Sequence, residues 1–157
     1  DAIEQLAGLR RFTTDAMRAL GAESRNDCAP REVLFPMRDK AGTVIGMRRR
    51  RSDGKSFSGV KALCRKGDNS GLMCPWPFPP GPEAILITEG EMDACAALST
   101  GYASVAATPG ATVSQHVVSA LQRICADRDV FFSLILMPPD KDGGNPSLNR
   151  LQIPAVR

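Results

Sequence analysis

A short apolar run that ends in acidic residues stands at positions 84–93, AILITEGEMD. Its first five residues, 84–88, predict a strand that is buried on both faces. The alanine-rich stretch at 92–99 ends at a Thr-Gly pair, which favours a helix directly after that strand. A strand followed by a helix is the repeating unit of a parallel α/β sheet, so this stretch decides the expected fold.

The same alternation continues toward the carboxyl terminus. Residues 103–107 predict a second strand, and Ser114 can cap a helix that continues to about residue 126. Residues 131–137, FFSLILM, predict a third strand. We therefore expect an α/β fold with a parallel sheet, right-handed crossovers and flanking helices.

The amino-terminal half has a different pattern, and a proline-rich segment separates it from the sheet. Five prolines in the nine residues 74–82 predict an extended connector, with Trp76 and Phe78 packed on a neighbour or stacked on a base. Upstream, a short helix capped by Thr13 or Thr14 precedes an antiparallel meander built from 33–36, 43–51 and 55–58. The expected parts are a small basic α+β subdomain at 1–74, the connector at 75–82 and a parallel-sheet domain at 83–157.

Composition limits the class of protein. The chain has 157 residues, of which 43% are hydrophobic and 24% charged, as in ordinary globular proteins. No apolar run approaches the roughly 18–20 residues that span a bilayer, so no membrane is expected. Five cysteines without C-x-x-C spacing and a single histidine argue against a disulfide framework or a Cys/His zinc site, and favour a cytoplasmic setting. The start at Asp1 predicts a fragment of a longer protein.

The net charge of +3 is unevenly distributed along the chain. Residues 1–80 hold 15 Lys and Arg against 9 Asp and Glu, whereas residues 81–157 hold 5 against 8. A basic half beside an acidic half predicts contact with a polyanion in the first and with cations in the second. The alternative is an imbalance on a solvated surface.

Four carboxylates follow the predicted strands: Glu89, Asp93, Asp140 and Asp142. They lie at one edge of the sheet if the third strand neighbours the first, in the order 2-1-3. Clustered carboxylates repel one another unless a cation neutralises them, and an oxygen-only site selects Mg²⁺ or Mn²⁺. Such a site suits phosphoryl or nucleotidyl transfer. Taken singly, the same residues can complement a helix dipole or form a turn.

Three stretches in order resemble the Toprim family, the metal-binding module of bacterial-type primases, of type IA and type II topoisomerases and of some nucleases. They are 87–94, ITEGEMDA, then 108–110, TPG, and 136–143, LMPPDKDG. The E-G-E-x-D form is most similar to the primase and primase-helicase branch. The resemblance implies that Glu89 is the general acid/base and a metal ligand, and that Asp140 and Asp142 bind Mg²⁺ or Mn²⁺. Asp93, Gly90, Gly110 and Gly143 complete the motifs.

The resemblance further implies a DNA primase-like catalytic core from a phage or plasmid replication system. It would be a nucleotidyltransferase that joins ribonucleoside triphosphates on a single-stranded DNA template, with a replicative helicase domain as a partner. The basic residues expected to bind the template backbone are Arg38, Arg48, Arg50, Lys55 and Lys61. The alternative for the arginines of 48–51 is an edge strand that charge protects from aggregation.

Two other functions stay open. One is a non-catalytic Toprim module that binds nucleic acid or a helicase, and the other is a metal-dependent nuclease. A topoisomerase is disfavoured, because the single tyrosine, Tyr102, belongs to no cleavage domain. Residues 144–146, GNP, interrupt the helix expected after the last motif, so metal binding without independent priming is a further expectation.

Overall fold

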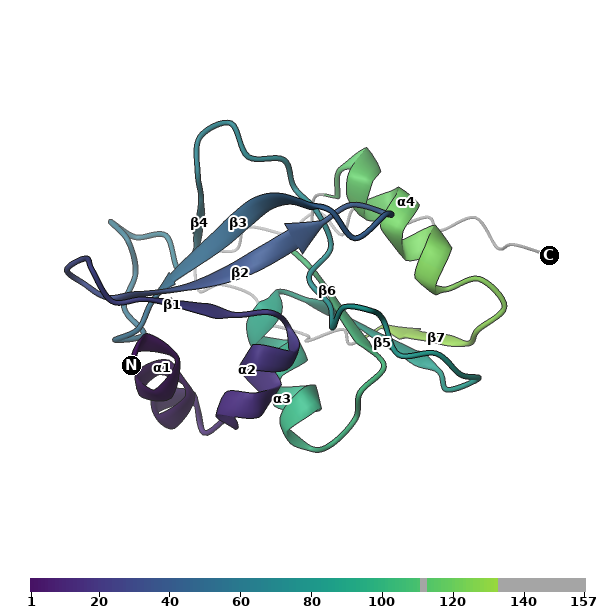
Figure 1. Cartoon of the computed structure of the whole chain (residues 1–157), viewed down its shortest axis with the longest axis horizontal. Helices are drawn as coiled ribbons and strands as arrows, with labels where there is room; N and C mark the ends of the chain where they lie inside the picture. Colours follow the sequence, from purple (N-terminus) through teal and green to yellow (C-terminus); the bar gives the residue numbers. More distant parts are fainter. Residues whose placement is uncertain (111–112, 133–157) are drawn as a thin grey trace, which may run out of the picture.

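A computed structural model of the chain describes residues 1–110 and 113–132. The elements in order are α1 (Ala2–Arg10), α2 (Thr14–Ala19), β1 (Glu23–Arg25), β2 (Glu32–Arg38), β3 (Val44–Arg51), β4 (Leu63–Cys64), β5 (Ile85–Glu89), α3 (Glu91–Ser99), β6 (Val105–Thr108), α4 (Gln115–Ile124) and β7 (Val130–Phe132). They form an antiparallel sheet, β1-β2-β3-β4, beside a parallel sheet, β6-β5-β7 (Figure 1). The chain is thus a mixed α/β fold, as the sequence predicts.

The parallel sheet has the expected strand order. Strand β5 lies in the centre, with β6 on one side and β7 on the other. Successive residues of β6 point to opposite faces: Val105 and Ala107 join the core that contains α3, whereas Ala106 joins the core that contains α4. Helices therefore cover both faces, which is why the strands are almost wholly apolar. The remainder of the predicted third strand, 133–137, lies outside the described residues.

The two helices of this sheet begin where local chemistry favours a start. Ser114 caps α4, because its Oγ accepts a hydrogen bond from the Val117 amide at 3.3 Å. Gly90 precedes α3 with φ at 95°, a conformation that side chains disfavour. This glycine lets the chain pass directly from the end of β5 into the helix.

The antiparallel meander is confirmed in β2 and β3, but its last strand differs from the prediction. Residues 55–58 form no strand, because Phe57 and Val60 pair with each other across a tight turn at Ser58 and Gly59, both with positive φ. Leu63–Cys64 pairs with β3 in their place. The structure also adds α1 and β1, which the sequence analysis did not predict.

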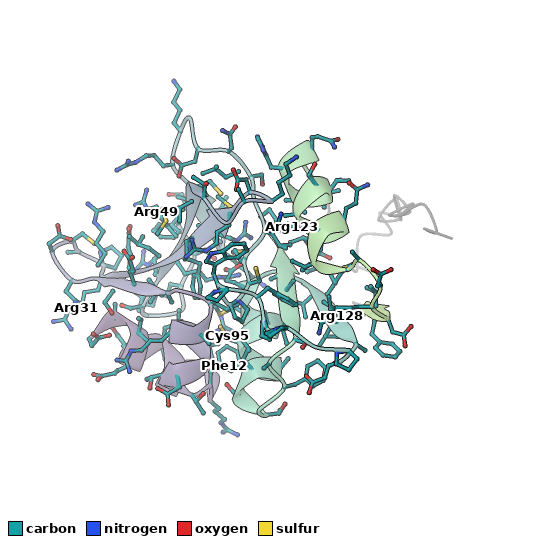
Figure 2. All side chains as sticks on the ribbon, turned by 45° about the vertical axis from the view of Figure 1, so that its right-hand side comes forward. Phe12, Arg31, Arg49, Cys95, Arg123 and Arg128 are labelled. Atoms are coloured by element: carbon teal, nitrogen blue, oxygen red, sulfur yellow. The ribbon has the colours of Figure 1, made fainter. Side chains whose placement is uncertain are left out.

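Two residues just before the connector join the sheets edge to edge. Leu72 pairs with Arg38 of β2, and Met73 pairs with Ala107 of β6. One buried core then continues from α1, α2 and β2 through Met73 to α3 and β6. Figure 2 shows Phe12 and Cys95 close together in this core.

The connector itself packs on its neighbours, as predicted. The Trp76 ring fills the space over Gly42, so closely that a Cβ there would lie 2.0 Å from it. Phe78 packs against the core under α4, with the guanidinium of Arg128 5.5 Å from its ring centre. Arg128 also donates to the backbone oxygens of Pro79 and Glu83, which holds the connector in place (Figure 2). Among the described helices, none has the length and apolar character to cross a membrane.

Candidate functional site

Glu89 is the last residue of the central strand of the parallel sheet, and it is exposed. It lies opposite Thr108, the last residue of β6. The following amide, Gly90 N, donates to the Thr108 carbonyl at 2.8 Å, and the Thr88 hydroxyl donates to the Gly90 carbonyl at 3.2 Å. The turn that carries Glu89 is therefore fixed to both strands at the carboxyl edge of the sheet, where open α/β sheets bind ligands.

Asp93 lies in the first turn of α3 and is half-buried. Its pKa is raised, first because burial disfavours the ionised carboxylate and second because Glu91 is close; Arg50 partly offsets this. A cation beside Asp93 would favour the ionised form of this carboxylate.

The remaining acidic residues of the predicted site, Asp140 and Asp142, lie outside the described residues, as does Gly143. Strand β7 runs parallel to β5 and thus points toward the edge at which Glu89 lies. Within 1–110 and 113–132, no three His, Cys, Asp or Glu side chains come together as a metal site. The full ligand set therefore stays a prediction.

Glu91, for which the sequence predicted no role, is completely buried. Its Oε2 lies 2.7 Å from Arg48 Nε, and its Oε1 accepts a hydrogen bond from Arg50 Nε. Both arginines come from the same face of β3, as the alternation of the strand predicts. The sequence signals were the second glutamate of the E-G-E-x-D form and two cations spaced i, i+2 on a strand, and neither one shows that these residues pair.

The other face of β3 also forms ion pairs. Arg49 binds Glu32 in a two-point contact, with Nε–Oε2 at 3.0 Å and Nη2–Oε1 at 2.5 Å (Figure 2 labels Arg49). Arg51 binds Asp53 in the same way, and this hydrogen bonding lowers the pKa of Asp53 to about 2. All four arginines of 48–51 thus have carboxylate partners inside the molecule.

The basic residues proposed for template binding divide into two groups. Arg38, Arg48 and Arg50 make internal contacts; Arg38 Nη1, for example, donates to the Gly42 carbonyl at 2.9 Å. Lys55 and Lys61 are exposed. Their contact with a template stays a prediction for both groups.

Lys55 and Lys61 belong to the segment between β3 and β4, residues 52–62, here called the basic loop. Two further exposed cations, Arg65 and Lys66, follow β4 directly and were not singled out from the sequence. Arg50 connects this loop to the acidic motif, because its Nη1 donates to the Lys61 carbonyl at 3.5 Å while its Nε binds Glu91. Arg50 therefore links the backbone of the basic loop to the first residue of α3.

No protein-family model matches the chain, and no curated protein matches it. Solved structures do. A DnaG primase catalytic domain bound to single-stranded DNA matches with a TM-score of 0.58 and 16% identity, covering 83% of this chain and 53% of that one. The E. coli primase catalytic core matches with a TM-score of 0.56 and 16% identity, covering 83% and 54%.

A third match is a chain from a structure of bacteriophage T7 lagging-strand DNA polymerase interacting with primase domains bound to an RNA/DNA hybrid and dTTP. Its TM-score is 0.58 at 17% identity, and the match covers 85% of this chain and 61% of that one. The fold is therefore that of a primase catalytic core, and the chain spans about half the length of the primase cores that it matches.

Proposed function

We propose that the chain is part of a DNA primase-like catalytic core with a Toprim-type metal site. It would join ribonucleoside triphosphates on a single-stranded DNA template. The observation that carries this proposal is the position of Glu89 at the carboxyl edge of a β6-β5-β7 sheet, in a fold like that of primase cores.

The proposed metal ligands are Glu89, Asp140 and Asp142, with Asp93 next to them. Oxygen ligands favour Mg²⁺ or Mn²⁺. Asp93 is included because it lies in the first turn of α3, four residues after Glu89. When bound, a divalent ion supplies charge neutralisation for the phosphates of the nucleotide and for the attacking and leaving oxygens.

In this proposal Glu89 accepts the proton of the attacking 3′-hydroxyl. The hydroxyl oxygen bonds to the α-phosphorus, the bond between that phosphorus and the bridging oxygen breaks, and pyrophosphate leaves. The exposed cations of the basic loop, together with Arg65 and Lys66, hold phosphates of the template strand. Glu89 suits its role because it is exposed on a turn that both strands hold in place.

The central test compares two glutamates at opposite ends of β5. Glu89→Gln removes the charge at the carboxyl edge, whereas Glu83→Gln changes an exposed glutamate just before the amino end. We expect Mn²⁺ to bind the wild-type chain and the Glu83 variant, and the Glu89 variant to bind it at least tenfold more weakly. In an assay in which the wild-type chain incorporates ribonucleotides on single-stranded DNA, the Glu89 variant alone should lose that activity, and Mn²⁺ binding is the readout that does not depend on independent priming.

The outcomes separate this proposal from a non-catalytic module. The exposed cations Lys55, Lys61, Arg65 and Lys66 would serve nucleic-acid binding without a metal site, which supports that alternative as the second candidate. Template binding that survives Asp140→Asn with Asp142→Asn, together with no Mn²⁺ binding by the wild-type chain, would establish it. Strand cleavage without added nucleotides would indicate a nuclease.

A further inference from the structure

We propose that the buried cluster Glu91, Arg48 and Arg50 is a positioning element that fixes the acidic motif against the antiparallel sheet. The proposal rests on the proposed function, because it assigns these residues to the alignment of the metal site with the template surface. Its physical basis is the contact itself, which joins β3 to the first residue of α3.

The position of Glu91 in the chain makes this contact consequential. Glu91 lies two residues after Glu89 and two before Asp93, so anchoring it constrains a predicted metal ligand on each side. The preceding residue, Gly90, has a φ of 95° and no side chain that could accept hydrogen bonds from the first amides of α3. The two arginines bind the side chain of Glu91, the first residue of α3, and thereby tie the start of the helix to β3.

The chemistry of the cluster favours a directional role over a purely stabilising one. Removing a carboxylate and two guanidinium groups from water costs free energy that an apolar cluster would not incur. Each carboxylate oxygen of Glu91 faces a different arginine, and Arg48 and Arg50 are 18% and 14% exposed. Arg48 Nε touches Oε2 without the alignment of a hydrogen bond, so the Arg50 contact is the directional one. A carboxylate held at both oxygens cannot rotate freely.

The cluster also reaches the basic loop. Arg50 donates to the Lys61 carbonyl as well as to Glu91. One guanidinium therefore touches the loop proposed to bind the template and the motif proposed to bind metal. A change in the Glu91–Arg50 contact would therefore affect both the basic loop and the acidic motif.

The structure offers a matched control on the same strand. Glu32 is a buried carboxylate that binds Arg49 on the opposite face of β3, with a two-point contact. Glu32 lies on β2 and Arg49 on β3, and among the described residues neither forms a hydrogen bond or ion pair with α3. Glu32→Gln therefore removes a comparable charge from a comparable partner without altering the acidic motif.

The experiment measures amide hydrogen exchange and Mn²⁺ binding in the full 157-residue chain. In Glu91→Gln we expect exchange at residues 88–94 to become about tenfold faster or more, and Mn²⁺ affinity to fall about tenfold, the usual size of a supporting-shell effect. Glu32→Gln should change neither quantity at that segment. Arg48→Gln, which keeps the Arg50 contact, should give a smaller effect of the same sign and serves if Glu91→Gln does not fold.

Several results would overturn the inference. Unchanged exchange at residues 88–94 in both Glu91→Gln and Arg48→Gln would remove the positioning role, and so would an equal effect of Glu32→Gln. If the wild-type chain binds no Mn²⁺ yet exchange at 88–94 still rises in Glu91→Gln alone, the positioning role stands and the proposed metal site falls.

Discussion

The free cysteines differ in burial, so the rate at which each thiol reacts measures how tightly that single residue is packed. Burial raises the pKa of the Cys74 and Cys95 thiols to about 12, whereas Cys64 is exposed at the end of β4. The thiolate is the reactive form, so at pH 8 only about one buried thiol in 10⁴ is available for reaction. We expect an aromatic disulfide reagent to modify Cys64 rapidly and to modify Cys74 and Cys95 only on unfolding.

Peptide mapping of the labelled chain by mass spectrometry checks this expectation. Cys64→Ser should remove the rapid labelling of the peptide that contains residue 64, whereas the half-buried Cys28 and Cys125 label separately from it. Denaturant should expose the buried thiols. Between pH 7 and pH 9 the buried thiols should stay slow, because both values lie well below 12. Rapid labelling of Cys95 in the native chain would contradict the packing of α3 against α2 and β6.

The arginine run at 48–51 illustrates which residue-level features a sequence can predict. Alternation along a strand separates Arg48 and Arg50 from Arg49, and the structure has them on opposite faces. Their carboxylate partners were not predictable, because Glu32 is 17 positions from Arg49 and Glu91 is 41 positions from Arg50. Local periodicity gives the direction of a side chain along a strand, whereas its partner depends on how distant elements pack. Glu91 was missed for the same reason.

At the scale of elements, the start of α4 depends on one hydroxyl. Ser114 Oγ accepts from the Val117 amide and donates to the Ser70 carbonyl at 2.6 Å, so it also joins the helix to the segment before the connector. Ser114→Ala should lower the free energy of unfolding by about 1–2 kcal/mol and the melting temperature by about 2–6 °C. Thermal denaturation followed by circular dichroism measures the shift.

Ser119→Ala is the matched control within the same helix. Alanine is the better helix former at an interior position, so this variant should be neutral or slightly more stable. Equal losses in the two variants would mean that Ser114 contributes as an ordinary helical residue, without a capping role.

The elements that the sequence predicted well share a strong local signal. The start of β5 and the extent of α3 follow the apolar run and the alanine-rich stretch to within a residue or two. By contrast, β1 is the polar triplet Glu23–Arg25, which pairs with β2 through backbone groups and has no pattern of its own. Backbone pairing between distant segments determines such strands, so a local pattern cannot reveal them.

The candidate site was predictable to a similar extent. The 2-1-3 strand order places Glu89 at the carboxyl edge, as expected from crossover topology and ligand position in open sheets. The ion pairs that occupy the arginines were not expected, because a strand pattern does not distinguish a cation facing nucleic acid from one facing a buried carboxylate. That distinction requires the packing of α3 on β3.

At the scale of the whole molecule, a proline-rich connector predicts two parts, but the described residues share one core. The core includes residues of α1, α2 and β2 on one side of the connector and of α3 and β6 on the other, with Met73 between them. Met73 is fully buried, and its amide and carbonyl both pair with Ala107, at 3.0 and 2.7 Å. Parts joined in this way should unfold together.

Met73→Ala tests whether the residues on the two sides of the connector unfold as one unit. Removing the buried side chain should lower the free energy of unfolding by about 2–5 kcal/mol and the melting temperature by about 5–15 °C. Fluorescence of the single tryptophan, Trp76, follows the connector, while circular dichroism follows the helices on both sides. If the core is shared, the melting temperatures from both signals fall equally in Met73→Ala, in a single transition. The control is Met47→Ala, at a half-buried position on β3, which should lower both melting temperatures less. Two separated transitions in the wild-type chain would instead mean that the connector divides independent folding units, and that Met73 is a surface of contact between them.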